Sequence, residues 1–385
     1  MKQTVRVLMD LIRAEVTGAA ADSAAFLALT EEEQNETAAL AKDHSLAQLL
    51  GDGLGRDPEA AALPVVKSLV RESMLALSHT AKLDKERNKI CALLDRAEIP
   101  YVCLKGARIR PYYPEPWMRT SCDNDILVPE KDVDRAAALL SGELGYTCGE
   151  RDYHDISLFS KTGVHLELHF SIREDTEQMD RVLSRVWDHC NPVPGSFERV
   201  QSPEFFLFHL IAHMAYHFVH GGCGVRPFVD LFLLETKLPR REEEVAALCR
   251  EAGIHRFYEN VQALTAVWFK GAAHTAATCR MEEYILSGGV FGTHENSVAV
   301  DRQRQGGKAG YLLHRIFMPA DGLCRKYPSL EKHRWLAPAY QLRRWAEGLT
   351  PEKLGNARQD LDLVRSTEDS AAARMERMLE ENGLG

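Results

Sequence analysis

The sequence predicts an α+β protein in which a small mixed β-sheet with helices lies between two helical regions. Apolar residues repeat at helical spacing before residue 97 and again beyond residue 191. Between these regions, short apolar runs alternate with polar residues, as strands do, and turn-forming residues separate them. We therefore expect a helical region at 1–97, a sheet module at 98–190 and a helical domain at 191–385.

Composition restricts the class of protein. The 385 residues are 45% hydrophobic and 27% charged, which is ordinary for a globular protein long enough to bury a core. A net charge of -9 argues against broad nucleic-acid binding. None of the nine cysteines forms a Cys-x-x-Cys pair. No signal peptide or apolar run of about 20 residues is visible, so we expect a cytoplasmic protein without membrane contact.

Helical signals dominate residues 1–97. Val5, Leu8 and Ile12 form an apolar stripe, and Thr30 precedes three glutamates, as a helix N-cap does. A long helix is expected from near Val65 to Arg96. No catalytic constellation is visible in this region.

The sheet module begins with the apolar run at 99–104. Lys105-Gly106 then turns into a helix, where glycine permits close approach of a ligand and free N–H groups suit phosphate. An amphipathic helix is expected from Lys131 to Gly145. The runs at 156–159 and 164–170 predict a hairpin, and the prolines of 192–195 predict a linker to the next region.

Three acidic residues form the candidate active site. Side chains i and i+2 of a strand share a face, so Asp123 and Asp125 project together. Glu167 lies in a second alternating run, whose polar face also carries His165 and His169. Converging carboxylates repel, and Mg²⁺ or Mn²⁺ removes that conflict. The pattern predicts a two-metal site, although Asp-x-Asp beside a strand is also typical of a turn with solvated acids.

The motifs occur in a recognisable order. Leu-Lys-Gly at 104–106 is followed by Tyr-Pro, Arg119, Asp-x-Asp-Ile-Leu-Val at 123–128 and Leu-Glu-Leu-His at 166–169. This set resembles the uncharacterised nucleotidyltransferase family of the DNA polymerase beta-like superfamily, most densely over 101–170. The resemblance implies a polymerase beta-like catalytic module at 98–190. Lys105-Gly106 stands where the superfamily usually has Gly-Ser.

The resemblance also implies roles for these residues. Asp123 and Asp125 match the metal pair, and Glu167 matches the third acid. Lys105, Gly106 and Arg119 are expected to position a nucleoside triphosphate, and His169 to orient substrate unless it is a half-buried strand histidine. For Lys105, a solvated loop lysine is the alternative.

A histidine stripe follows on the helix that Ser202 caps. His209, His213, His217 and His220 fall within roughly 80° of the helix circumference. The other faces are apolar, which predicts a buried helix. The stripe has three explanations: it faces the active site and binds nucleotide or acceptor, it binds a transition metal through His213 and His217, or each histidine is satisfied by core hydrogen bonds.

Arg226 and Asp230 lie one helical turn apart and are expected to pair. The pair either fixes a guanidinium toward the cleft, where the resemblance places it, or is a structural ion pair.

The expected reaction transfers NMP from an NTP to an acceptor with release of pyrophosphate. We expect the acceptor to be a small molecule, a protein or a peptide rather than nucleic acid. Two alternatives stay open. One is a non-catalytic nucleotide-binding or interaction protein with the same fold, and the other is a metal-dependent phosphohydrolase built on the helical histidines, with His154-Asp155 as its candidate pair.

Overall fold

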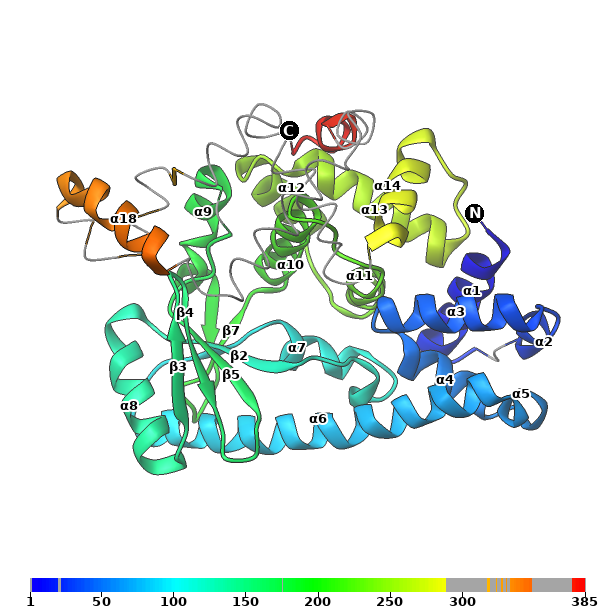
Figure 1. Ribbon diagram of the computed structural model, residues 1–385, viewed down its shortest axis with the longest axis horizontal. Helices are drawn as coiled ribbons and strands as arrows, with labels where there is room; N and C mark the ends of the chain where they lie inside the picture. Colours follow the sequence, from blue (N-terminus) through cyan, green and yellow to red (C-terminus); the bar gives the residue numbers. More distant parts are fainter. Residues whose placement is uncertain are drawn as a thin grey trace.

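The protein has an α+β architecture in which a five-stranded mixed sheet lies among helices from both ends of the chain (Figure 1). The predicted fold class is confirmed. The computed structural model describes residues 2–19, 22–174, 176–288, 317–318, 323, 327, 330, 333–347 and 376–384.

The N-terminal helices lead into one long helix. They are α1 (Gln3–Thr17), α2 (Ser23–Leu27), α3 (Glu31–Asp43), α4 (Ala47–Gly55), α5 (Pro58–Ala62) and α6 (Pro64–Arg96). Thr30 caps α3 and forms the reciprocal capping box with Glu33. Helix α6 has 33 residues, which confirms the long helix expected there, and it runs along one side of the molecule in Figure 1.

The sheet has the strand order β1-β2-β5-β4-β3. Its elements are β1 (Val102–Cys103), α7 (Lys105–Ile109), β2 (Asp123–Leu127), α8 (Val133–Leu144), β3 (Thr147–Arg151), β4 (Asp155–Phe159) and β5 (His165–His169). Strands β2 and β5 are parallel, and the other neighbours are antiparallel. The expected hairpin is therefore present. The expected helix before Gly145 is present too, and Gly145 ends it in the left-handed conformation.

The two faces of the sheet have different chemistry. Ile126, Leu158, Leu166 and Leu168 belong to an apolar core that also contains residues of α6 and α8. Asn124 points the same way and donates a hydrogen bond to the Leu83 carbonyl of α6 at 3.0 Å. The opposite face carries the acids and histidines of β2 and β5, because side chains alternate along a strand.

A second sheet replaces the linker expected at residues 192–195. Strands β6 (Cys190–Pro192) and β7 (Arg199–Gln201) pair antiparallel across this segment. The Arg199 N–H donates to the Tyr101 carbonyl at 2.7 Å, so the hairpin is fixed to the start of the main sheet. The linker prediction is wrong, because backbone pairing orders these residues. Asp95 also orders them by accepting a hydrogen bond from the Phe197 N–H.

The remaining helices follow the sheet module. They are α9 (Glu177–Leu183), α10 (Pro203–Val219), α11 (Arg226–Lys237), α12 (Glu242–Glu251), α13 (His255–Lys270), α14 (Ala276–Gly288) and α18 (Ala337–Glu347). Among them, α10 and α11 face the polar side of the sheet across a cavity. Short 3₁₀ helices occur at Arg110–Tyr112, Pro116–Met118, Glu130–Asp132, Val186–His189 and Arg334–Leu336. Among the helices of the described ranges, none is both long and apolar enough to cross a membrane.

One apolar core joins the two ends of the chain. Leu8 and Ile12 of α1 belong to the same buried cluster as Phe228 of α11 and Phe257 of α13. Two polar contacts reinforce the junction. His44, after α3, accepts a hydrogen bond from the Val225 N–H at 3.3 Å. Gln48 of α4 donates to the Met118 carbonyl at 2.6 Å. The N-terminal helices therefore support the segments that come just before Arg119 and Arg226.

Candidate active site

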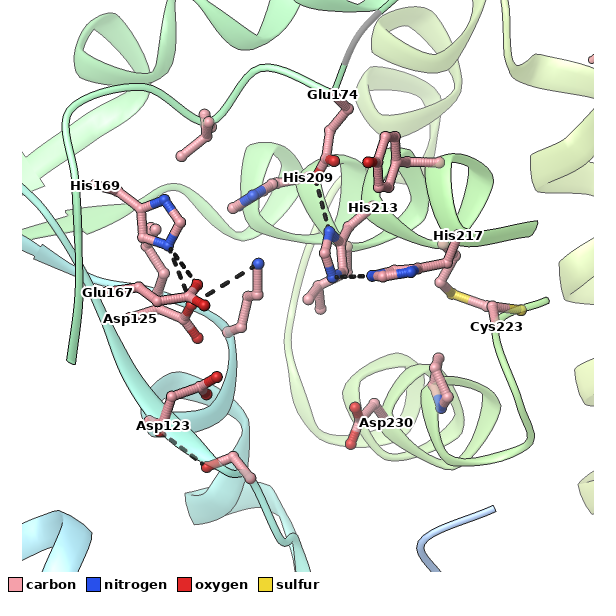
Figure 2. Close-up of a pocket in the computed structure, with 18 of the residues that line it drawn as sticks. Asp123, Asp125, Glu167, His169, Glu174, His209, His213, His217, Cys223 and Asp230 are labelled. Atoms are coloured by element: carbon pink, nitrogen blue, oxygen red, sulfur yellow. Dashed lines mark hydrogen bonds and ion pairs between the residues drawn. The ribbon is translucent and has the colours of Figure 1, made fainter. Parts of the chain in front are cut away.

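A cavity of about 320 Å³ lies between the polar face of the sheet and helices α10 and α11 (Figure 2). The sequence-predicted site residues that line it are Lys105, Arg119, Asp123, Asp125, Glu167, His169, His213, His217, Arg226 and Asp230. Gly106 is not among the lining residues. A Cβ atom at Gly106 would lie 3.0 Å from Arg119 Nη1, so this glycine leaves room for the arginine.

The three acids share one face of the sheet. Asp125 and Glu167 are register partners on β2 and β5, and Asp123 lies two residues before Asp125. Oxygen and nitrogen atoms of Asp123, His165 and Glu167 lie within 4.8 Å of one another, as do those of Asp125, Glu167 and His169. The structure therefore brings the predicted acids together at spacings that a metal ion could bridge, and their metal-binding role stays a prediction.

The electrostatics of the two aspartates differ. Burial and the charges of Asp125 and Glu167 raise the pKa of Asp123 to about 6. Burial also acts to raise the pKa of Asp125, but Lys105 and His169 together hold it well below its ordinary value. The Lys105 Nζ atom lies 3.9 Å from Asp125 Oδ1. Lys105 and His169 therefore outweigh the effect of burial on Asp125, whereas burial and the neighbouring carboxylates outweigh the charges of Lys105 and His165 on Asp123.

His169 connects the acids of the two strands. Its Nε2 lies 3.1 Å from Asp125 Oδ1 and 3.3 Å from Glu167 Oε2, and the residue is only 3% exposed. Burial acts to lower the pKa of His169, but the hydrogen bonds to both carboxylates raise it to about 9. A carboxylate can only accept, so the Nε2–H of His169 is the donor.

Lys105 begins α7 in an unusual backbone conformation. Its φ of 32° lies on the positive side, where a residue with a Cβ is disfavoured. Burial acts to lower the pKa of Lys105, but the charges of Asp125, Glu174 and Glu167 raise it above its usual value. This ammonium group therefore stays charged inside the cavity, next to the acids rather than in a solvated loop.

Arg119 is held by a buried carboxylate from α11. Its Nη2 and Nε lie 3.1 and 3.4 Å from the two oxygens of Asp230. Tyr113 donates to Asp230 Oδ1 at 2.7 Å. The expected pair between Arg226 and Asp230 is therefore wrong, because Arg119 reaches Asp230 with a two-pronged geometry. Arg226 instead donates to the Thr120 carbonyl at 3.2 Å.

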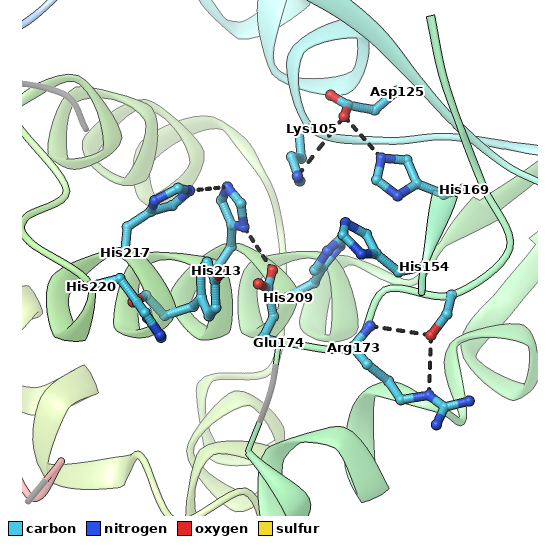
Figure 3. A network of polar contacts seen from close by, with 12 residues as sticks. Lys105, Asp125, His154, His169, Arg173, Glu174, His209, His213, His217 and His220 are labelled. Atoms are coloured by element: carbon cyan, nitrogen blue, oxygen red, sulfur yellow. Dashed lines mark hydrogen bonds and ion pairs between the residues drawn. The ribbon is translucent and has the colours of Figure 1, made fainter. Parts of the chain in front are cut away.

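The histidine stripe divides along α10 (Figure 3). His209, His213 and His217 line the cavity. His209 is also 1% exposed, and its Nδ1 lies 3.3 Å from Gln201 Nε2. The Nδ1 of His220 lies 2.7 Å from the Tyr216 carbonyl of its own helix. Cavity lining and internal hydrogen bonding thus both occur along the stripe, and its contact with nucleotide or acceptor stays a prediction.

A hydrogen-bonded row fixes the middle of this stripe. His213 Nδ1 lies 2.7 Å from Glu174 Oε1, and His213 Nε2 lies 3.0 Å from His217 Nε2. Burial lowers the pKa of His213 well below its usual value and that of His217 to about 3, so both rings are neutral at pH 7. Glu174 must accept from His213 Nδ1–H, and His213 Nε2 then accepts from His217.

Several cavity residues carry no signal in the sequence. Glu174, Tyr153, Ser121, Cys122 and Tyr216 line the cavity together with the predicted residues. Glu174 lies in the loop after β5, and its partner His213 is 39 residues away. No local motif marks such a contact, because the path of the chain after β5 creates it.

Comparisons with known proteins add one family and one structure. A family model described as "Uncharacterised nucleotidyltransferase" matches residues 30–270, from the cap of α3 to the last residue of α13. The solved structure of the antibiotic-resistance factor ANT(2'')-Ia is 16% identical, with a TM-score of 0.33, over 48% of this chain and 96% of that chain. No curated protein matches the chain.

Proposed function

Because the chain belongs to the uncharacterised nucleotidyltransferase family, we propose that it is a metal-dependent enzyme that transfers NMP from an NTP to an acceptor with release of pyrophosphate. One observation carries the proposal. Asp125 and Glu167 face each other across parallel strands, and Asp123 projects from the same face into the same cavity. Such a trio of acids is suited to two-metal chemistry on phosphates.

Asp123, Asp125 and Glu167 would hold Mg²⁺ or Mn²⁺. Their carboxylate oxygens are the donors that such hard cations prefer. The raised pKa of Asp123 supports this assignment, because it reflects burial and repulsion that a cation would relieve. Metal ions at such a site activate the attacking oxygen and stabilise the charge on the transferred phosphoryl group.

The basic side chains of the cavity would position the triphosphate. Lys105 supplies a point charge next to Asp125, and Arg119 presents a guanidinium that Asp230 holds in place. Gly106 contributes by leaving space for Arg119, and Arg226 contributes a second guanidinium at the cavity wall. Phosphoryl transfer depends mostly on positioning and charge stabilisation, which this arrangement supplies.

The acceptor would lie against α10. His213 and His217 are neutral, and Glu174 fixes the orientation of His213. Neutral imidazoles donate and accept hydrogen bonds without a charge of their own, so this wall suits a hydroxyl or phosphate nucleophile. His169 would orient the reacting groups through its contacts with Asp125 and Glu167.

The experiment is a label-transfer assay. The purified chain is incubated with each of the four α-³²P-labelled NTPs, Mg²⁺, and small-molecule or protein fractions of a cell extract. We expect label to appear on an acceptor together with pyrophosphate. Asp123→Asn should lower the rate by about 10²- to 10⁴-fold, since the metal stabilises transition-state charge by several kcal/mol.

Asp134→Asn is the matched control, because this aspartate lies on α8 with 81% of its side chain exposed. It should leave the rate unchanged. Phosphate release without label transfer would indicate a phosphohydrolase instead. Saturable nucleotide binding without turnover would indicate a non-catalytic nucleotide-binding protein.

A further inference from the structure

A second group of metal-ligating side chains lies one strand away from the acids. Asp155 of β4 is the register partner of His169 of β5, so both side chains emerge from the polar face. His154 directly precedes Asp155. Ligand atoms of these three residues lie within 4.8 Å of one another, and His154 Nε2 is 3.2 Å from Asp155 Oδ2.

The free nitrogen of His169 is an independent observation at this group. Its Nε2 is engaged by Asp125 and Glu167. Its Nδ1 is buried and has no hydrogen-bond partner within the described part of the chain, and the same holds for His154 Nδ1. Buried polar atoms are almost always satisfied, so unpartnered nitrogens on two neighbouring imidazoles call for a ligand.

We propose that His154, Asp155 and His169 bind one divalent transition-metal ion of the zinc type, at a site separate from the three acids. The ligands are His169 Nδ1, a ring nitrogen of His154 and a carboxylate oxygen of Asp155. Because Nε2–H of His169 is donated to the carboxylates, the Nδ1 lone pair is the one left to coordinate an ion.

The surroundings of His169 fit this role. Metal-binding histidines usually donate their other ring N–H to a carboxylate, which fixes the ring and its tautomer. Asp125 accepts that hydrogen bond from Nε2 at 3.1 Å. Neighbouring ligand atoms around tetrahedral zinc are about 3.4 Å apart, so atoms within 4.8 Å need only modest side-chain rotation.

The donor set distinguishes this site from the magnesium site. Imidazole nitrogens favour zinc and other transition metals, whereas carboxylate oxygens alone favour Mg²⁺. Three protein ligands leave one coordination position for water or substrate. His154 and His169 line the cavity, so an ion held by them would lie at its wall.

The test measures metal binding rather than nucleotidyl transfer. The full chain is stripped with EDTA, dialysed into saturating Mg²⁺ to occupy the acids, and titrated with Zn²⁺ by calorimetry. We expect one Zn²⁺ per chain. Asp155→Asn and His154→Gln should each weaken zinc binding by at least about 100-fold, and Asp125→Asn by roughly tenfold through His169.

Two controls keep the outcome interpretable. Glu150→Gln removes an exposed carboxylate of β3 and should leave zinc affinity unchanged. Asp123→Asn removes a predicted magnesium ligand and should also retain zinc binding. Thermal melting of each variant confirms that it is folded. As a second measurement, each variant is loaded with Co²⁺ and then titrated with Zn²⁺. The loss of the cobalt absorption bands reports zinc binding.

The proposal is overturned if folded wild-type protein binds no zinc. It is equally overturned if Asp155→Asn and His154→Gln bind zinc as tightly as wild type. Zinc affinity that depends on Asp123 and Glu167 but not on Asp155 would place the ion among the acids and would also refute it. None of these results bears on whether NMP is transferred, so the two proposals fail separately.

Discussion

Asp125 and Glu167 stand opposite each other on parallel strands, and the single ring nitrogen Nε2 of His169 contacts both. This contact fixes the register of β2 against β5, because a slip by one residue would move either acid to the apolar face. Asn124 reinforces the same register from the opposite face through its hydrogen bond to α6. The geometry of the site therefore depends on the pairing of β2 with β5. Substitutions of its residues should change stability and ligand binding in predictable directions.

Without metal, Asp123 should destabilise the folded protein at neutral pH. Its folded pKa of about 6 exceeds the ordinary 3.8, so the stability that it contributes is present below pH 3.8 and is lost as pH rises through 6. In EDTA, Asp123→Asn should raise the free energy of unfolding at pH 7.5 by up to about 3 kcal/mol, but not at pH 3.5. Urea unfolding at the two pH values measures this difference. An Asp123→Asn protein that is less stable than wild type at pH 7.5 would contradict the predicted repulsion between Asp123 and its neighbouring carboxylates.

The buried pair of Arg119 and Asp230 should show strong energetic coupling. Asp230→Ala leaves a buried guanidinium and the Tyr113 hydroxyl without their acceptor, at a cost of about 3–5 kcal/mol of unfolding free energy. Adding Arg119→Met should recover part of this cost. A double-mutant cycle by urea unfolding should give a coupling of about 1–3 kcal/mol.

The exposed pair of Arg151 and Asp134 provides the comparison for this cycle. Its coupling should lie near 0–1 kcal/mol, because solvent screens exposed charges. Equal coupling energies for the two pairs would contradict the structural role of Asp230.

Gly106→Ala should weaken nucleotide binding. The new Cβ would meet Arg119 Nη1 at 3.0 Å and Ser121 Oγ at 3.3 Å, so the guanidinium must move. We expect the Kd of an NTP, measured by calorimetry, to rise about three- to tenfold, or about 1 kcal/mol. Gly142→Ala on α8 is the matched control, because its Cβ meets nothing within 4 Å. It should add about 0.5–1 kcal/mol of stability and leave the Kd unchanged.

His209 should make the protein sensitive to mild acid. Burial lowers its pKa to about 3, so the stability that depends on its neutral form is present above pH 6.5 and is lost as pH falls toward 3. Between pH 7.5 and 5, wild type should lose about 2 kcal/mol more than His209→Gln. At pH 7.5, the difference in unfolding free energy between wild type and His209→Gln gives the packing cost of the substitution. Parallel curves over this range would show that folding leaves the pKa of His209 unchanged and would refute the prediction.

Local patterns predicted much of the fold. The alternation in 164–170 predicted β5, and Thr30 and Ser202 marked helix starts that the structure confirms. The apolar circumference of α10 predicted its burial. These features depend on neighbouring residues, so a single sequence contains them.

Partner choice could not be predicted in the same way. Asp230 has Arg226 one turn away, yet it pairs with Arg119, which is 111 residues distant. The loop before β2 brings Arg119 to Asp230 of α11, and this path of the chain has no sequence pattern. The same holds for Glu174, whose hydrogen bond to His213 exists only because the chain after β5 passes over α10.

The contacts that His44 and Gln48 make with the cavity segments connect the first helices to the geometry of the site, and no sequence motif predicts this connection. Gln48 anchors the residue before Arg119, and His44 anchors the residue before Arg226. If Arg119 and Arg226 bind the same phosphates, a protein that lacks its first helices would bind nucleotide more weakly. It would still have Asp123, Asp125 and Glu167. Substitutions that inactivate the protein from outside the cavity should therefore cluster around the contacts of His44 and Gln48.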